Sequence, residues 1–119
     1  FGLYGVLLVD DPREEVRVDD ERVFVLSDVA VAGNEMEHPD SGGQLGMAFG
    51  REGNHVLVNG RTDATLTVQD GAVERWRIVN AAKSRYFLLD LEGIVFTRIG
   101  TDGGLQERAT DHGALVLTP

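Results

Sequence analysis

Turns that contain glycine divide the second half of this sequence into short apolar runs, and this pattern limits the possible folds more than any other feature. The turns are Asn59-Gly60, Asp70-Gly71, Glu92-Gly93 and Asp102-Gly103-Gly104. Asn59-Gly60 is the strongest hairpin signal, because this pair readily adopts the positive φ angles of a tight turn. Apolar and polar residues mostly alternate with a period of two, which is typical of β-strands. Strands spaced about 8–12 residues apart favour a sandwich or a Greek-key barrel, so we expect an all-β fold.

Strands are expected wherever an apolar run lies between two turns. The expected ranges are Val23–Val29, Val56–Val58, Thr65–Val68, Val73–Val79, Tyr86–Leu91, Ile94–Ile99 and Leu115–Leu117. In the Val73–Val79 strand, alternation places Trp76 and Ile78 on one face and Arg75 and Arg77 on the other. The sequence predicts no long helix; a single helical turn is considered near 81–83 or 106–110.

The stretch from Ala32 to Asn54 shows no periodicity and is rich in glycine. A long structureless loop is unusual inside a compact domain, so this stretch is interpreted as a functional lid, a mobile insert or a misassigned element. It also contains an acidic cluster with one histidine, namely Glu35, Glu37, His38 and Asp40. Such a cluster could weakly hold a divalent cation, but a solvated acidic loop is the favoured interpretation.

Length and charge exclude several classes of protein. The chain has 119 residues, which fits one domain with its own core. It carries 20 acidic and 11 basic residues, for a formal net charge of -9. This balance argues against a nucleic-acid partner and against an anionic membrane surface, since both require a basic face. No apolar run approaches the roughly 20 residues of a membrane-spanning helix.

The residues that could support catalysis do not form a recognised motif. The absence of cysteine excludes disulfides, thiolate metal sites and a thiol nucleophile. The three histidines, His38, His55 and His112, lack the close spacing of metal ligands and are interpreted as exposed loop residues. Ser27 and Asp28 do not suggest a triad with His112, because no nucleophile-elbow motif is present. The residues alone therefore indicate an acidic β-domain without a visible catalytic site.

Several blocks, taken in order, resemble the laccase-like multicopper oxidases, a family built from cupredoxin domains. Residues 2–9 resemble the end of the first domain of that family, and residues 23–28 resemble the opening strand of the second. The remaining blocks are Val56–Arg61, similar to the L-V-N-G hairpin, Arg75–Ala81, similar to R-W-R-I-V-N-A, and the segments Thr101–Gly104 and Leu115–Pro119. Each block alone is weak, whereas the ordered set is fairly specific and spans nearly the whole chain.

The resemblance implies a domain organisation. Residues 1–12 would end a preceding cupredoxin domain, residues 13–22 would be a charged linker, and residues 23–119 would form a middle domain. Copper-binding domains of the family carry histidine-rich ligands after the V-N block, whereas Arg85–Leu91 contains no histidine. We therefore expect a copper-free, cupredoxin-like Greek-key sandwich or barrel. The family's closing strand would follow Pro119, so another piece of chain is expected to complete the sheet.

The implied activity belongs to the parent protein. It would oxidise phenols, aromatic amines or reduced metal ions at a blue copper and reduce oxygen to water at a trinuclear copper cluster. Those coppers would lie in other domains; this segment would hold no cofactor and no catalytic residue. Its partners would be the flanking cupredoxin domains or other pieces of the same polypeptide, and the parent would take electrons from a small-molecule donor. The family is usually exported, which implies a periplasmic or extracellular parent.

One substrate-contact position is implied by the resemblance. Laccase-like members carry an acidic residue near the substrate, just before the hairpin, and Asn54 occupies that position, followed by His55. A neutral asparagine can hydrogen-bond a phenol but cannot stabilise a developing cation. Asn54 is therefore a candidate cleft residue with His55, and the alternative is an ordinary turn residue after Gly53.

Two other functions stay open at this point. A copper-free relative of the same architecture could be a structural or interaction protein of the cell envelope. Histidine-rich blocks in the flanking sequence would decide between that protein and the oxidase. A free-standing β-sandwich binding module, with residues 32–54 as its binding surface, is the remaining alternative.

Overall fold

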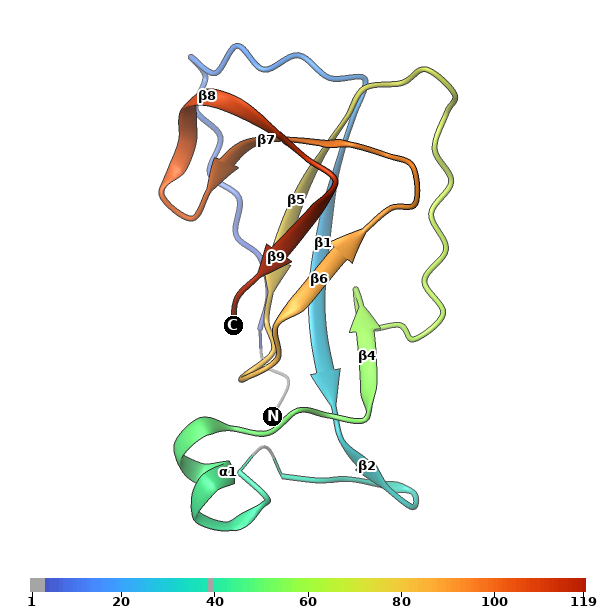
Figure 1. Ribbon diagram of the computed structural model, residues 1–119, viewed down its shortest axis with the longest axis vertical. Helices are drawn as coiled ribbons and strands as arrows, with labels where there is room; N and C mark the ends of the chain where they lie inside the picture. The colour runs from blue at the N-terminus through green and yellow to red at the C-terminus, as the bar shows by residue number, and fades with distance from the viewer. Residues whose placement is uncertain (1–3, 39) are drawn as a thin grey trace. The chain divides into compact units, whose positions relative to one another are not determined.

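The computed structural model describes residues 4–38 and 40–119 and is mostly β, which confirms the expected all-β class (Figure 1). The chain divides into two units, residues 1–85 with Pro119 and residues 86–118. The first unit contains β1 (Asp20–Val29), β2 (Val31–Ala32), β3 (Glu35–Met36), α1 (Gly43–Phe49), β4 (His55–Val58) and β5 (Glu74–Asn80). The second contains β6 (Phe87–Asp90), β7 (Phe96–Thr101), β8 (Gly104–His112) and β9 (Ala114–Leu117). No helix in the described ranges is long and apolar enough to cross a membrane.

Strand β1 is the centre of the first unit's main sheet, whose order is β4-β1-β5. It pairs in parallel with β5, from Asp20 opposite Glu74 to Leu26 opposite Asn80, and antiparallel with β4. In Figure 1 the long β1 arrow runs between the other two strands. The strand begins at Asp20, earlier than the apolar run that predicted it, because its charged first residues also pair with β5.

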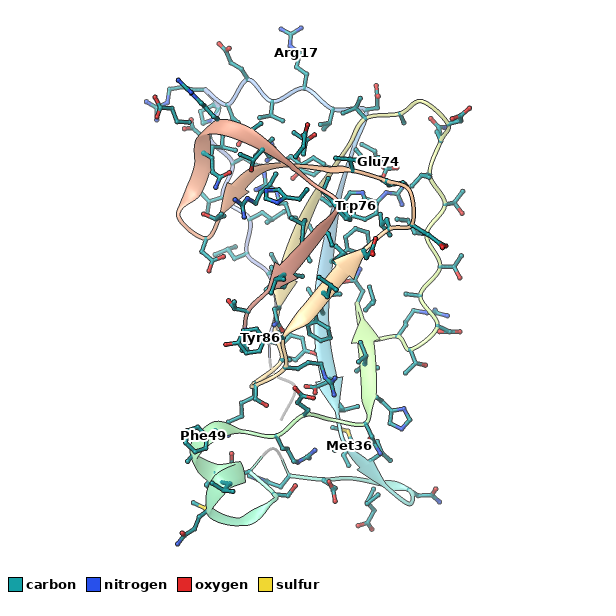
Figure 2. All side chains as sticks on the ribbon, in the orientation of Figure 1. Arg17, Met36, Phe49, Glu74, Trp76 and Tyr86 are labelled. Atoms are coloured by element: carbon teal, nitrogen blue, oxygen red, sulfur yellow. The ribbon has the colours of Figure 1, made fainter. Side chains whose placement is uncertain are left out.

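The apolar face of the β1–β5 pair includes an aromatic contact. Paired residues of parallel strands point to the same side, so Phe24, Trp76 and Ile78 share a face, as the alternation predicted for the last two. The rings of Phe24 and Trp76 meet edge to face, with centroids 4.9 Å apart. The indole Nε1 donates to Glu74 Oε2 at 2.8 Å (Figure 2). This hydrogen bond satisfies the one polar group of the tryptophan.

The opposite face of β5 is charged and holds the segment that precedes β1. Arg75, whose side chain is 9% exposed, forms ion pairs with Glu14 and Glu21. Arg77 pairs with Glu21 and approaches Asp10 Oδ1 at 3.9 Å. Residues 10–14 are thus held against the sheet by charge.

The tight turn at Asn59-Gly60 is confirmed, since both residues have positive φ, 51° and 77°. Val58 N donates to Arg61 O at 2.8 Å, and Arg61 N donates to Val58 O at 3.1 Å. The strand expected at Thr65–Val68 is wrong: no strand forms there, and β4 pairs with β1 instead. The Asn59 side chain accepts from Val25 N at 2.8 Å and donates to Val23 O at 3.0 Å. The Asn59 side chain therefore forms hydrogen bonds with backbone groups of β1 that a neighbouring strand would otherwise bond.

The helix predictions are also wrong. The helix lies at Gly43–Phe49, inside the 32–54 stretch that showed no periodicity and for which a misassigned element was one interpretation. Strands β2 and β3 form a short hairpin at the start of the same stretch. Residues 106–110 belong to β8, and residues 81–83 are not helical. Two glycines inside α1 lower its helix propensity and conceal it in the sequence. Gly46 is required there, because a Cβ would overlap the carbonyl of Ser41.

The second unit consists of two antiparallel strand pairs. Strands β6 and β9 pair from Phe87 opposite Leu117 to Asp90 opposite Ala114. Strands β7 and β8 form a hairpin around the predicted Asp102-Gly103-Gly104 turn, with a register shift between Arg98 and Gly100. Strand β8 was not predicted, because most of its side chains are polar and exposed and it has no apolar alternation. The expected strands at 86–91, 94–99 and 115–117 are confirmed within a few residues.

We predict that Asn59→Ala destabilises the protein by about 2–3 kcal/mol. The change removes two side-chain hydrogen bonds to β1 and places a residue that disfavours positive φ in the turn. Chemical denaturation would measure the loss. Asn59→Gly keeps the turn geometry and loses only the hydrogen bonds, so it should cost less. Equal stability of Asn59→Ala and the unmodified protein would contradict this role.

Candidate functional site

The two candidate cleft residues lie next to each other at the start of β4 and are both exposed. The Asn54 side chain accepts a hydrogen bond from Val31 N and donates one to Val31 O, each at 2.9 Å. Both polar groups of the Asn54 amide are therefore bonded to the backbone of Val31. His55 is the first residue of β4 and pairs with Val29 of β1. The imidazole is thus presented from a fixed backbone position.

The backbone before Asn54 is fixed by a mostly buried ion pair. Arg85 Nε donates to Asp28 Oδ2 at 2.9 Å, and the Asp28 side chain is 5% exposed. Gly53 lies between the two charges: its N donates to Asp28 Oδ2 at 2.5 Å, and its carbonyl accepts from Arg85 Nη2 at 2.6 Å. A Cβ at Gly53 would overlap the backbone of Val29, so no larger residue fits. Asp28, Gly53 and Arg85 are called the Asp28–Arg85 clamp below.

The turn after β5 orients the arginine of the clamp. Asn80 Nδ2 donates to Arg85 O at 2.8 Å, while Asn80 Oδ1 accepts from Ala82 N at 2.9 Å. Ala81 N donates to Leu26 O at 2.7 Å, which joins this turn to β1. The V-N-A block therefore shapes the loop that carries Lys83 and Arg85.

Nothing in the sequence pattern identified Arg85, and Asp28 was considered only as a possible member of a catalytic triad. The two residues lie far apart in the chain, and only the β1–β5 register brings them together. Of the residues considered for a triad, Ser27 is 2% exposed and its hydroxyl accepts from Tyr4 OH at 2.6 Å. The Asp28 carboxylate is bound in the clamp. Neither group is arranged for nucleophilic catalysis.

The acidic cluster of the 32–54 stretch is divided among separate partners. Asp40 forms an ion pair with Lys83, and this hydrogen bond lowers the pKa of Asp40 below its usual 3.8. Glu37 Oε2 lies 3.7 Å from Arg51 Nη1, and His38 Nδ1 accepts from Asp40 N at 3.2 Å. Across residues 4–38 and 40–119, no three His, Cys, Asp or Glu side chains are grouped as metal ligands. The described residues therefore do not fit a copper centre.

An open groove of about 670 Å³ lies at the other end of β4. Its walls combine apolar and charged side chains from β1, β4 and the segment after the tight turn, namely Arg22, Val23, Phe24, Val58, Asn59, Arg61, Asp63, Ala64, Thr65 and Leu66. Asn54 and His55 are not among these residues. The structure thus places the groove and the candidate cleft residues at opposite ends of the same strand.

We predict that Arg85→Met destabilises the protein by about 3 kcal/mol, because it leaves the Asp28 carboxylate buried without its partner. The Gly53 carbonyl would lose its donor in the same step. Chemical denaturation would measure the change. The matched control is Arg61→Met, which breaks an ion pair of highly exposed side chains with Asp63 and should leave stability nearly unchanged. A loss no greater than that of the control would show that the clamp carries little stability.

Comparison with known proteins identifies the family. The model of the multicopper oxidase family matches residues 20–112, from the first residue of β1 to the last of β8. A laccase of Bacillus subtilis (strain 168) is 37% identical over 68 residues, which cover 56% of this chain and 13% of the laccase. The chain thus aligns with only a small part of that relative's length. No solved structure matches the chain significantly. Because the family model spans most of the chain and the ordered blocks agree with it, this chain belongs to the multicopper oxidase family.

Proposed function

We propose that residues 23–119 form the copper-free middle cupredoxin-like domain of a laccase-like multicopper oxidase. Residues 1–12 would end the preceding domain, and residues 13–22 would connect the two. The family match over residues 20–112 is the observation that carries this proposal. The residue types of β6 support it, since Arg85–Leu91 offers no histidine where copper-binding domains of the family place their ligands.

The parent would take single electrons from a phenol, an aromatic amine or a reduced metal ion and reduce oxygen to water, and we expect it outside the cytoplasm. Its coppers would be bound by the flanking domains. The present segment would be scaffold and cleft wall, with other parts of the polypeptide packed on it. Leu88 and Val116, which lie opposite each other on β6 and β9 and are 68% and 66% exposed, support the need for such packing.

Within this scheme, His55 is the side chain that contacts the electron donor, and Asn54 fixes its position. The Asn54 amide is already bonded to Val31 at both ends, so a donor would have to displace a backbone partner to reach it. The Asp28–Arg85 clamp holds Gly53 and so fixes the backbone that leads into Asn54 and His55. A neutral imidazole or its cation can hydrogen-bond a phenolic hydroxyl.

The full-length protein tests the proposed activity. Loaded with copper, it should show the absorption band of a blue copper and consume oxygen in the presence of a phenol. Removal of copper with a chelator should abolish both signals, and adding copper back should restore them. A full-length protein that binds no copper and consumes no oxygen would instead support the copper-free structural or interaction protein of the cell envelope.

His55→Ala should raise the KM for a phenolic donor about threefold to tenfold and leave kcat nearly unchanged, because it removes one donor contact and none of the copper ligands. Asn54→Ala should instead lower stability, since it removes both bonds to Val31. Steady-state kinetics and denaturation of the two full-length variants separate the roles. Asp70→Ala, in an exposed turn, serves as the surface control. An unchanged KM in His55→Ala would exclude this residue from the cleft wall.

A further inference from the structure

The segment that contains α1 is held by few packing contacts of its own. Leu45, Met47 and Phe49 are 71%, 68% and 74% exposed, and the buried residue of the helix is Gly46. In Figure 2, Phe49 lies at the outside of this segment. The helix thus exposes the apolar side chains that normally stabilise a helix by packing.

Capping does not compensate for the missing packing. Gly42 precedes the helix without a side-chain cap, the first turn has no acidic residue and the last turn has no basic residue. A helix of seven residues with these ends is marginal by itself in water. Its stability must come from the contacts that hold its two ends.

Glycines mark both ends of the segment. Gly42 and Gly43 have φ angles of 104° and 72°, and Gly50 has a φ of 76°. Such backbone angles are accessible to glycine at little cost, and glycine also allows the largest changes of φ and ψ. The backbone on both sides of α1 can therefore change conformation easily.

One side chain from outside the segment contacts both ends. Lys83, the only lysine of the sequence, forms an ion pair with Asp40 ahead of α1. Its stem lies against Gly50 behind α1, where an added Cβ would be 2.9 Å from Lys83 Cγ and 3.0 Å from Cδ. The turn that carries Lys83 is itself joined to β1 through Ala81.

The base of the segment is closed by a separate set of contacts. Arg51 Nη2 donates to the carbonyls of Glu37 and His38 at 2.9 and 3.0 Å, and the Arg51 side chain is 18% exposed. Gly53 follows in the Asp28–Arg85 clamp. These contacts remain when Lys83 is released, because none of them uses its ammonium group.

We propose that residues 40–50 form a flap latched by Lys83, which loosens as a unit when the Lys83–Asp40 ion pair opens, while Arg51 and the Asp28–Arg85 clamp keep its base closed. The latch is sensitive to ionic strength, because the Lys83 and Asp40 side chains are 46% and 44% exposed and their attraction is screened by salt. The clamp is far less accessible to salt. The flap does not depend on the proposed oxidase activity.

Hydrogen exchange of the full-length protein, followed by mass spectrometry, tests this flap. Lys83→Met should increase exchange in the peptide that covers residues 40–50 about two- to fivefold, without changing peptides from β1 and β5. High salt should produce the same increase in the unmodified protein and no further increase in Lys83→Met. Lys83→Arg, which keeps the charge, should stay close to the unmodified protein. Arg61→Met, which breaks an exposed ion pair elsewhere, should leave residues 40–50 unchanged.

Two results would overturn the flap. One is unchanged exchange of residues 40–50 in Lys83→Met, which would show that the latch does not hold the segment. The other is an equal rise in residues 40–50, β1 and β5, which would show that Lys83 stabilises the whole unit rather than a flap.

Discussion

The Asp28–Arg85 clamp is the contact on which the arrangement of the first unit depends. Asp28 lies in the central strand, Arg85 follows the parallel partner strand, and Gly53 lies at the end of the long excursion between them. A carboxylate that is 5% exposed must keep its cation, because a buried charge without a partner costs several kcal/mol. The clamp therefore fixes where the excursion from residue 30 to residue 54 returns to the sheet. It also fixes where β4 begins.

Two asparagines perform the same task at the two ends of β4. Asn54 bonds both backbone groups of Val31 before the strand, and Asn59 bonds Val25 and Val23 after it. A strand of four residues offers few ladder hydrogen bonds, so Asn59 adds a substantial share of its attachment to β1. Asn54 instead attaches the residue before β4 to the start of β2. The position that the resemblance assigned to substrate contact thus has a structural task in this chain. An acidic residue at position 54 could not donate to Val31 O, whereas the asparagine of this sequence can.

The sequence predicted those features that depend on local chemistry. Alternation located β5, β6, β7 and β9 within a few residues, and Asn59-Gly60 fixed its turn because both residues tolerate positive φ. It did not predict the partner of β4, because β4 pairs with β1 and not with the residues that follow the Asn59-Gly60 turn. Helix α1 was concealed by its glycines, although Gly46 is there because a Cβ would meet Ser41. Arg85 could not be recognised either, because its role depends on the β1–β5 register.

Ion pairs, rather than buried apolar side chains, hold the irregular segments of the first unit against its sheet. Among the described residues, few apolar residues are buried, namely Leu26, Ala30 and Ala82. Arg75 instead holds the segment before β1, Arg85 holds the end of the long excursion, and Lys83 holds the flap. These three cations differ in exposure, from 9% for Arg75 to 46% for Lys83. Because screening by salt acts most strongly on exposed pairs, the three attachments should loosen in the order of their exposure, with the Lys83 latch first. The first unit can therefore release one surface segment and still keep its sheet in register.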